Sequence, residues 1–567
     1  MTARFDTFDY LILIVYFLGT MGIGWWSWRK GKATSEEFTS GGRNLSGWLC
    51  GLSIFATFLS SITFLALPGA AYNSDWNLFV FSLSLPIAAW VAARWFLPYY
   101  RQNQDASAYA MLERRFGLWA RWIASLLFIA VQLARMSFVM YLMALPLAII
   151  FEWDIRLLIT GTGVAVMIYA TMGGIVAVIW ADAIQAVVLS AGAVIALVLI
   201  LYGLPNGVSD LLPLANRAEG SKFSLGTFDW RTWTGSAFWL VLSYGLFENL
   251  RNFGVDQNYI QRYVSAKPQE AVWSLWFGAL LYVPVSALFL LIGSSLFAFY
   301  QRHPQDLQEV RRIVEKQQQP ITSGLSMPRE EIVADGAVVG STVGEAVSPT
   351  VEGKFGSADE SGSGQAQGGP ARTGISEQVA SATPVVKLGD RVFPHYIAKY
   401  LPPGIKGLLI AAIFSAAMST ISTSLNSVAT IVLSDFYLRG WRPLAEDRQR
   451  LWVLRIVTVV AAVLAVGGAM ALVTLTGSAL DAWWTISSVL GTGILGLFLL
   501  GRWVAAAGQT DAAIGLLAGF GVVAALIFGQ EWAWGEVFVD LKMSIVFGTI
   551  AVVGAGWCSS WVTRSNA

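Results

Sequence analysis

The residues best suited to binding an ion and a solute lie in two apolar segments that are rich in hydroxyl groups. Within the apolar stretch 48–72, residues 56–63 read ATFLSSIT and carry four hydroxyls, and Pro68 and Gly69 follow. A helix broken in this way survives in hydrocarbon only where protein or a wet cavity satisfies its backbone. A second hydroxyl-rich segment, 416–423, is expected to be interrupted as well. Paired interrupted helices are the usual sequence signature of a transporter's ion and substrate site.

Arg135 is the candidate anchor for an anionic solute. It lies near the middle of the apolar segment 122–151, where a charge costs at least ~2.5 to 3.5 kcal/mol on insertion scales and is usually functional. A guanidinium can hold a carboxylate through two parallel hydrogen bonds. The alternative is a structural ion pair with Glu248 or Asp256. Glu248 and Arg251 are spaced i, i+3, so they can also satisfy each other on one helix.

Asp182 and a stripe of hydroxyls are candidate ligands for a hard cation. Asp182 lies in the first part of the apolar segment 175–201, and Na⁺ prefers oxygen ligands. The alternative is a carboxylate stabilised by the positive end of a helix dipole. The stripe occupies one face of a helix, with Thr420 one step round. Its members are Ala416, Ser419, Ser422 and Thr423. Small polar residues also serve simply to let helices approach closely and hydrogen-bond.

The composition excludes several classes of protein. The 567 residues are 55% hydrophobic and 13% charged, a balance typical of polytopic membrane proteins. A net charge of +1 leaves no basic face for a nucleic acid. The two cysteines, Cys50 and Cys558, and the two histidines, His303 and His395, give neither a disulfide framework nor a metal spacing. They also supply no catalytic cluster, so we do not expect an enzyme.

The chain has about thirteen apolar stretches of the ~17 residues or more that cross ~30 Å of hydrocarbon. They are residues 10–26, 48–72, 78–100, 122–151, 157–172, 175–201, 233–250, 273–299, 405–433, 451–472, 482–500, 512–528 and 543–561. The seventh is expected to continue past Asn252, because Gly254 and Asp256 interrupt it without ending it. The sequence therefore predicts an all-α polytopic membrane protein with about thirteen transmembrane helices.

Arginine and lysine clusters predict the orientation through the positive-inside rule. The expected cytoplasmic cations are Arg29, Lys30, Lys32, Arg43, Arg101, Arg114, Arg115, Arg121, Arg262, Lys267, Arg439, Arg442, Arg448 and Arg450. This order places the N-terminus outside and the C-terminus in the cytoplasm, as in a multi-pass protein of the inner membrane. The polar loop 301–391 then lies outside. Its part from 322 to 383 is rich in Gly, Ser, Glu and Gln, and we expect it to be disordered.

Several stretches give the chain a specific resemblance. They are 169–175 (YATMGGI), 178–185 (VIWADAIQ), 256–263 (DQNYIQRY) and 419–427 (STISTSLNS). In these motifs the chain resembles the sodium:solute symporters, whose core has the five-plus-five inverted-repeat fold of the leucine transporter. Residues 56–57 (AT) with 59–64 (LSSITF), Tyr72 with 74–76 (SDW), and Arg135 make it most similar to the bacterial sialic acid symporters. The resemblance covers nearly everything except the outer loop.

The resemblance implies a division of the chain and two sodium sites. Residues 1–300 would hold the first helix, the first repeat and the start of the second. Residues 301–391 would form the outer loop, and 392–567 the remainder. A first Na⁺ would be bound by the carbonyls of Ala56, Leu59 and Ala416 and by the hydroxyls of Ser419 and Thr420. A second Na⁺, present in some members, would use Asp182, Ser419, Ser422 and Thr423.

The resemblance also implies a substrate site with an altered lining. Arg135 would meet a substrate carboxylate, assisted by the hydroxyls of Ser60, Ser61 and Thr63. Where sialic acid members carry threonine and glutamine, this chain has Phe58 and Ser82, and an aromatic position is lost at Leu78. Glu248 adds an acid where a small residue is common. An intact anion anchor in an altered pocket indicates sialic acid or another acidic sugar or carboxylate.

The function expected from these features is sodium-coupled import of a small organic solute by alternating access. Two alternatives stay open: a sodium-coupled carrier of neutral sugars, and a membrane sensor that keeps the fold without transporting. The expected partners are Na⁺, the solute and the lipid bilayer. The sequence leaves the oligomeric state open.

Overall fold

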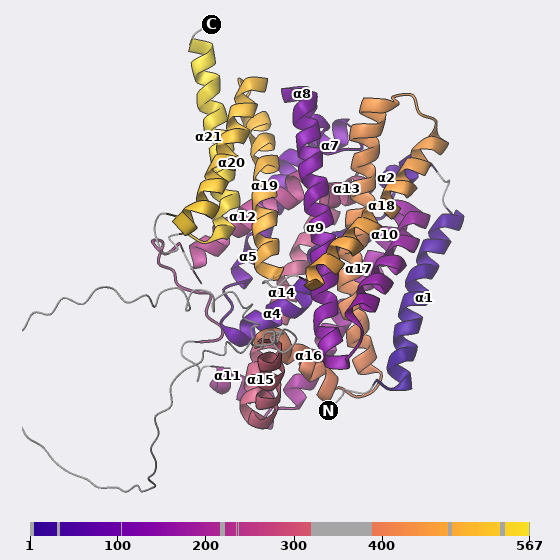
Figure 1. The fold of residues 1–567 in the computed structure, drawn as a ribbon, viewed down its shortest axis with the longest axis vertical. Helices are drawn as coiled ribbons and strands as arrows, with labels where there is room; N and C mark the ends of the chain where they lie inside the picture. The colour runs from indigo at the N-terminus through magenta and orange to yellow at the C-terminus, as the bar shows by residue number, and fades with distance from the viewer. Residues whose placement is uncertain are drawn as a thin grey trace, which may run out of the picture.

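The computed structural model of the chain is a bundle of helices (Figure 1). It describes residues 5–30, 34–103, 105–215, 221–233, 235, 237–318, 388–474, 479–532 and 539–565. These residues contain no β-strand, only two isolated bridges. The predicted all-α class is therefore confirmed.

The helices follow one another with short connections in most places. In chain order they are α1 (Thr7–Lys30), α2 (Ser35–Ser40), η1 (Gly41–Arg43), α3 (Gly47–Phe58), α4 (Ser61–Asn73), α5 (Phe79–Leu83), α6 (Leu85–Val91), η2 (Ala92–Phe96), α7 (Leu97–Asn103), α8 (Ala110–Phe116), α9 (Leu118–Phe151), α10 (Ile155–Tyr202), α11 (Val208–Ala215), α12 (Phe238–Val255), α13 (Gln257–Ser265), α14 (Ala271–Arg302), α15 (Pro304–Gln318), α16 (Gly389–Tyr400), α17 (Ile405–Ile431), η5 (Val432–Trp441), α18 (Asp447–Thr474), α19 (Ala479–Trp503), α20 (Gln509–Trp532), η6 (Leu541–Met543) and α21 (Ser544–Ser565).

Ten of the described helices are long and apolar enough to cross a membrane. The bent pair α3 and α4, with 53° between its halves, raises that number to eleven when it counts as one span. One of the ten, α10, has 48 residues, and a straight helix of that length would be about 72 Å long. It is kinked at Gly174, whose φ of 55° and ψ of −148° are not helical. The count of thirteen spans stays a prediction.

Gly174 is required at this kink for two reasons. Its positive φ lies in the region that L-residues rarely adopt. A Cβ there would also come within 2.7 Å of the Phe38 ring. The kink divides α10 into segments that agree with the predicted stretches 157–172 and 175–201.

The broken spans are only partly those expected. The segment 48–72 is interrupted as predicted, but the break lies at Leu59 and Ser60. The prediction that Pro68 and Gly69 break the helix is wrong, because both lie within α4. The seventh span is also broken, because α12 ends at Val255 and Asp256 separates it from α13. The predicted interruption at 416–423 is wrong, since α17 is continuous from Ile405 to Ile431. Ser and Thr do not break a helix when their hydroxyls bond back to carbonyls of the preceding turn, as Thr423 does to Ser419.

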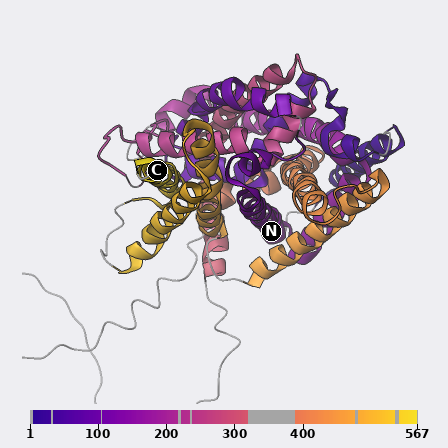
Figure 2. The same ribbon diagram turned by 90° about the horizontal axis from the view of Figure 1, so that it is seen from above.

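The centre of the bundle is α17. Together with η5 it forms the span Ile405–Trp441, in which 94% of the most apolar 18-residue stretch is buried. It packs against α10, α9, α1 and α18. The helix α14 lies along both α3 and α4, so it supports the first broken span on another side. Figure 2 shows the yellow helices α20 and α21 at the edge of the bundle, where α21 contacts α12 and α19.

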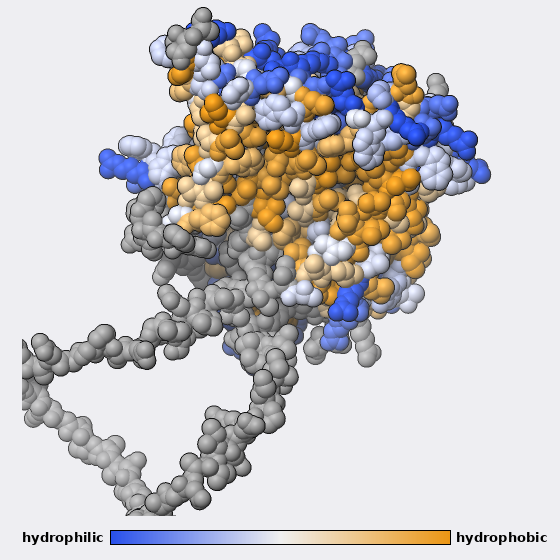
Figure 3. Space-filling view, turned by 45° about the horizontal axis from the view of Figure 1, so that its top comes forward, coloured by the Kyte–Doolittle hydropathy of each residue, from blue (hydrophilic) through white to orange (hydrophobic). Residues whose placement is uncertain are grey.

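The surface carries a broad apolar band between two polar ends. Figure 3 shows orange side chains across the middle and blue ones gathered at the top. Leu157, Val198 and Leu517 are among the exposed large hydrophobic residues that make up such a surface. In Figure 1, α1 begins at the end where α15 and α16 lie, whereas α21 finishes at the opposite end, near α8. A lipid-facing belt of this kind is expected of a multi-pass membrane protein.

The predicted outer loop is ordered at both ends. Residues 304–318 form α15, and α16 begins at Gly389, so the polar loop is shorter than the sequence indicated. Lys399 of α16 binds Asp306 at 2.7 Å and Glu309 at 2.5 Å on α15. The stretch 322–383, predicted to be disordered, lies outside the described residues.

Candidate functional site

The first broken span leaves backbone oxygens without helical partners. α3 ends at Phe58 because Leu59 (φ −85°, ψ 105°) and Ser60 (φ −106°, ψ 168°) are extended. Ser60 then caps α4, its hydroxyl accepting a hydrogen bond from the Thr63 backbone N–H at 3.3 Å. The last carbonyls of a helix have no N–H donors within it. At this break they lie deep inside the bundle and need other partners.

Side chains from three helices donate to these carbonyls. The pairs are Ser419 to Ala56 at 3.3 Å, Arg135 to Thr57 at 3.2 Å and Thr63 to Phe58 at 3.4 Å. No described residue donates to the Leu59 carbonyl. A hydroxyl can rotate its hydrogen aside and present an oxygen. The break therefore offers carbonyl and hydroxyl oxygens to a cation at a point where the backbone is buried.

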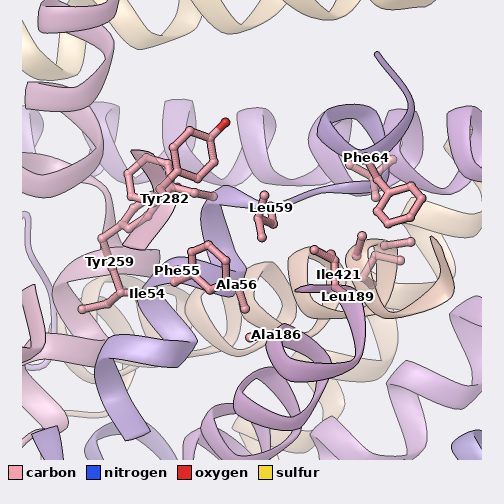
Figure 4. Close-up of a cluster of buried hydrophobic side chains, with 14 of the residues drawn as sticks. Ile54, Phe55, Ala56, Leu59, Phe64, Ala186, Leu189, Tyr259, Tyr282 and Ile421 are labelled. Atoms are coloured by element: carbon pink, nitrogen blue, oxygen red, sulfur yellow. The ribbon is translucent and has the colours of Figure 1, made fainter. Parts of the chain in front are cut away.

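The residues predicted for the first sodium lie around this break. On α17, the Ser419 and Thr420 hydroxyls are 3.2 and 3.3 Å from the Ala416 carbonyl oxygen. Since Ser419 also reaches Ala56, four of the five predicted ligand residues form one hydrogen-bonded cluster. Figure 4 shows Ala56 and Leu59 where α3 ends, with Ile421 of α17 nearby. Such an oxygen cluster, without an acidic side chain, fits a hard monovalent cation.

The residues predicted for the second sodium also meet. Asp182 is fully buried, and its Oδ1 is 3.4 Å from the Ser422 hydroxyl. Thr423 lies one residue further along the same helix and donates to the Ser419 carbonyl at 2.6 Å. Asp182 is eight residues beyond the kink at Gly174, away from a helix N-terminus. The alternative of a carboxylate held by a helix dipole is therefore not what the fold contains.

Arg262 is the partner of Asp182 that the sequence did not indicate. Its Nη2 lies 2.9 Å from Asp182 Oδ2 and also bonds the Thr423 hydroxyl, and its Nε donates to Ser53 at 2.7 Å. The prediction that Arg262 is a cytoplasmic loop cation is wrong, because its side chain is completely buried. An ion pair across two distant helices cannot be inferred from local charge patterns. The guanidinium leaves Oδ1, on the Ser422 side, as the open oxygen of Asp182.

Arg135 forms no salt bridge with a described acidic residue, although Asp256 interacts with it electrostatically from farther away. The two acids weighed as its partners are taken by Arg251, whose Nε donates to Glu248 at 3.0 Å and whose Nη1 is 3.6 Å from Asp256. The predicted pairing of Glu248 with Arg251 is thus confirmed. Arg135 donates to the Thr57 backbone carbonyl at 3.2 Å, and it also interacts with the Tyr259 hydroxyl of α13. Its charge is left available to an anion beside the break.

The predicted substrate hydroxyls differ in their surroundings. Ser60 and Thr63 face each other at 3.3 Å in the first turn of α4. Ser61 donates to the Val139 carbonyl on α9 at 3.2 Å, so its hydrogen is already engaged. Ser82 is buried on α5, a separate short helix that packs against α12 and α14. Ser60 and Thr63 are therefore the pair that the structure brings directly to the break.

Comparison with known proteins identifies the family of this chain. Residues 38–308 and 371–519 match the model of the sodium:solute symporter family. The chain belongs to the sodium:solute symporter family. This symporter is 30% identical to the sodium/sialic acid symporter NanT of Aliivibrio fischeri, over 99% of this chain and 94% of that protein. It is also 30% identical to SiaT of Proteus mirabilis, over 96% and 95% of the two chains.

More distant relatives and a solved structure agree with this assignment. The human sodium-coupled monocarboxylate transporter 1 is 26% identical over 92% of this chain and 73% of its own. A substrate-bound, outward-open sodium-coupled sialic acid symporter superposes with a TM-score of 0.78 at 28% identity, covering 99% and 98% of the two chains. The protein is therefore a multi-pass, sodium-coupled solute symporter, and Na⁺ is its coupling ion.

An aromatic cluster beside the break was missed by sequence reasoning. The Phe58 ring lies 5.3 Å from Phe253, 4.7 Å from Tyr259 and 5.4 Å from Tyr282, between ring centroids. These side chains come from α3, α12, α13 and α14, and Figure 4 shows Tyr259 and Tyr282 together on one side of Leu59. The one signal was Phe58 itself, a bulky residue in a hydroxyl-rich run. The symporter thus lines the space next to Arg135 with aromatic faces.

The charged residues of the described helices offer no alternative metal centre. No three His, Cys, Asp or Glu side chains among them gather closely enough to hold a metal ion. Both cysteines are free, Cys50 buried and Cys558 exposed. The candidate ion sites of the symporter are therefore built from backbone carbonyls, hydroxyls and Asp182.

Proposed function

We propose that this symporter imports an acidic sugar of the sialic acid class together with Na⁺ by alternating access. The observation that carries the proposal is Arg135, a guanidinium at membrane depth that forms no salt bridge with a described residue and lies beside the broken span. An ionised group at that depth needs a counter-charge. The two relatives at 30% identity are both named sodium/sialic acid symporters. A substrate carboxylate supplies the missing charge.

The first Na⁺ couples to transport by joining the broken span to α17. It is bound by Ala56, Leu59, Ala416, Ser419 and Thr420, and the hydroxyl hydrogens of Ser419 and Thr420 turn away from the carbonyls to allow this. The ligands lie on two elements that move relative to each other during alternating access. A cation shared between them favours the state in which both are close. Ser60, Thr63, Ser61 and Ser82 then complete the solute site around Arg135.

A second Na⁺ is bound by Asp182 through Oδ1, with Ser419, Ser422 and Thr423. Oδ2 stays with Arg262, so the carboxylate serves both cations at once. Two Na⁺ with a monovalent anion move one net charge, which gains about 2.3 kcal/mol per 100 mV of membrane potential. Transport current in proteoliposomes measures this directly. Electroneutral uptake would leave the first Na⁺ as the only coupled ion.

The aromatic cluster favours one further candidate among carboxylates. Phe58 is 8% exposed and packs against three other rings, in a position where sialic acid members carry threonine. The bulkier side chain leaves less room beside Arg135. A smaller monocarboxylate is therefore the second candidate substrate, with the same anchor and the same sodium ligands.

The remaining features of the proposal follow from the family and the charge pattern. The protein lies in the inner membrane with its N-terminus outside and its C-terminus in the cytoplasm. It binds and releases its solute unchanged and catalyses no reaction. Membrane orientation is testable by modifying the exposed Cys558 from either side of right-side-out vesicles.

A thermal-shift screen of the purified protein tests the substrate class. The panel contains sialic acid, glucuronate, lactate and the neutral sugar N-acetylmannosamine, each with Na⁺ or with K⁺. Anything that binds the folded state alone raises its unfolding temperature. We expect stabilisation by carboxylates in Na⁺ only. Stabilisation by the neutral sugar alone would reject the anion anchor and favour a neutral sugar carrier.

A further inference from the structure

A second arginine, Arg391, is buried and forms no salt bridge with a described residue, although the adjacent Asp390 interacts with it electrostatically. It lies in the first turn of α16, at the end of the bundle opposite α8 and the C-terminal end of α21 (Figure 1). Its side chain is 5% exposed, yet it donates no hydrogen bond to a described residue and its Nε has no acceptor. The other buried arginines behave differently. Arg121, Arg251 and Arg262 each pair with a carboxylate.

This lack of a partner is costly for the folded protein. Burying a guanidinium is strongly unfavourable unless it is paired and hydrogen-bonded. Burial lowers the pKa of Arg391, in spite of the neighbouring Asp390 carboxylate, so the charge is under-compensated. Among the described residues no acid pairs with this guanidinium, so an added anion would be stabilised here.

The surroundings fix Arg391 rigidly beside the first broken span. A Cβ on Gly389 would come within 2.2 Å of the Gly69 carbonyl oxygen, so the start of α16 lies directly on α4. The Gly389 N–H donates to the Asn73 side chain at 2.9 Å. Phe393 stacks on Phe64 with 5.6 Å between centroids. The start of α16, which carries Arg391, is therefore held in place by packing against α4.

Arg391 lies nearer than Arg135 to the end of the bundle that carries α15 and α16. α16 also packs on α9, and Arg391 interacts electrostatically with Tyr141 of that helix. Tyr141 is six residues beyond Arg135, or about 9 Å along the helix axis. The positive end of the α16 dipole points toward the same region and adds to the attraction for an anion. Arg391 and Arg135, neither of which forms a salt bridge with a described residue, thus lie at two levels along α9.

We propose that Arg391 forms an outer subsite that binds the carboxylate of the incoming solute before it moves to Arg135. The subsite rests on the proposed function, because it takes the same class of ligand. It raises the local concentration of the anion at the entrance and orients its carboxylate inward. The capture of a neutral solute does not depend on Arg391.

Uptake kinetics in proteoliposomes test the subsite with full-length protein and labelled sialic acid at low ionic strength. For Arg391→Gln we expect a half-saturating concentration about tenfold higher, since a focusing charge acts on capture, with the maximal rate unchanged. Arg391→Lys keeps the charge and should stay close to the wild type. The matched control is Arg302→Gln, which removes a surface cation 3.7 Å from Asp210 and should leave half-saturation unchanged. Wild-type half-saturation in Arg391→Gln would overturn the proposal.

Equilibrium binding of sialic acid provides a second measurement that needs no transport. Arg135→Gln should retain weak binding that disappears in the double variant with Arg391→Gln. If Arg135→Gln binds nothing while the wild type binds, the outer subsite is refuted and the proposed function stands. If the wild type binds no carboxylate, or if Arg135→Gln binds sialic acid as tightly as the wild type does, the proposed function itself has failed.

Discussion

The two broken spans of this symporter differ in whether their buried charges form salt bridges. At the α12–α13 break, Arg251 satisfies both Glu248 and Asp256 within a few residues. At the α3–α4 break the carbonyls accept from two hydroxyls and from one guanidinium that forms no salt bridge in the described part of the chain. A self-compensated break holds the fold, whereas an under-compensated one binds ligands. Similar interruptions in sequence can therefore serve different purposes.

The largest effect on stability is expected from a substitution at the α12–α13 break, where the buried charges are paired. Arg251→Gln leaves Glu248 and Asp256 buried without a cation, which costs about 3 to 5 kcal/mol of stability. Thermal unfolding of the purified protein measures the loss. Adding Glu248→Gln should recover part of it. The control Arg114→Gln removes a surface pair with Asp105 and should cost less than about 1 kcal/mol.

A substitution at the α3–α4 break should change ligand binding and hardly change the stability of the protein. Arg135→Ala is expected to weaken binding of a carboxylate solute by about 3 kcal/mol, or roughly 100-fold, as for a desolvated ion pair that loses one partner. Na⁺-induced stabilisation should persist, because Arg135 is not among the predicted sodium ligands. Calorimetric titration of the variant distinguishes the two ligands. A stability loss as large as that of Arg251→Gln would contradict the contrast between the breaks.

A smaller effect, on Na⁺ affinity, is expected from a substitution on α17. Ser419→Ala removes a hydroxyl that reaches the Ala56 carbonyl across the break, and about 1 kcal/mol of Na⁺ affinity is expected to be lost, in line with one hydrogen-bonding group. Ser415→Ala is the matched control, since its buried hydroxyl donates to Ala411 of the same helix and lies beside Tyr16 of α1, and no hydrogen bond joins it to the α3–α4 break among the described residues. The Na⁺ dependence of thermal unfolding compares the two. Equal Na⁺ affinity in both variants would remove Ser419 from the site.

The smallest effect concerns the charged contact outside the membrane. The hydrogen bond from Lys399 lowers the pKa of Glu309 below its ordinary value, against a weaker opposing effect of burial. A depressed folded-state pKa means that the contact stabilises at neutral pH and is lost as pH falls from about 4.3 through the lowered value. Limited proteolysis at α15 between pH 6 and pH 3 should show this, and Lys399→Met should remove the dependence. Both breaks should be unaffected.

Much of the fold was predictable because apolar length and broken helices leave strong sequence signals. The run of hydroxyls indicated the first break, and Gly254 with Asp256 indicated the second. Pro68 and Gly69 pointed to the right span but to the wrong place in it, because both lie inside α4. The hydroxyls of 416–423 misled, because serine and threonine can bond to their own helix, as Thr420 does to Ala416. Hydroxyl content alone therefore does not distinguish a broken helix from a continuous one.

The site was only partly predictable because its energetics depend on contacts between distant segments. The stripe on α17 was recognised from its spacing, but its partner Ala56 lies 363 residues away. Arg262 was taken for a loop residue, and nothing near it in sequence reveals that it pairs with Asp182. Arg391 gave no signal at all, since an uncompensated charge is visible only when every neighbour is known. Which positively charged residues lack partners is a property of the folded bundle.

The central claim is that the α3–α4 break binds a sodium ion and an acidic solute together. Uptake of labelled sialic acid into proteoliposomes, driven by a Na⁺ gradient or by an equal K⁺ gradient, tests it most directly. The account predicts accumulation with Na⁺ only, lost in Arg135→Ala and retained in Arg114→Gln. Equal uptake with K⁺, or undiminished uptake by Arg135→Ala, would contradict it.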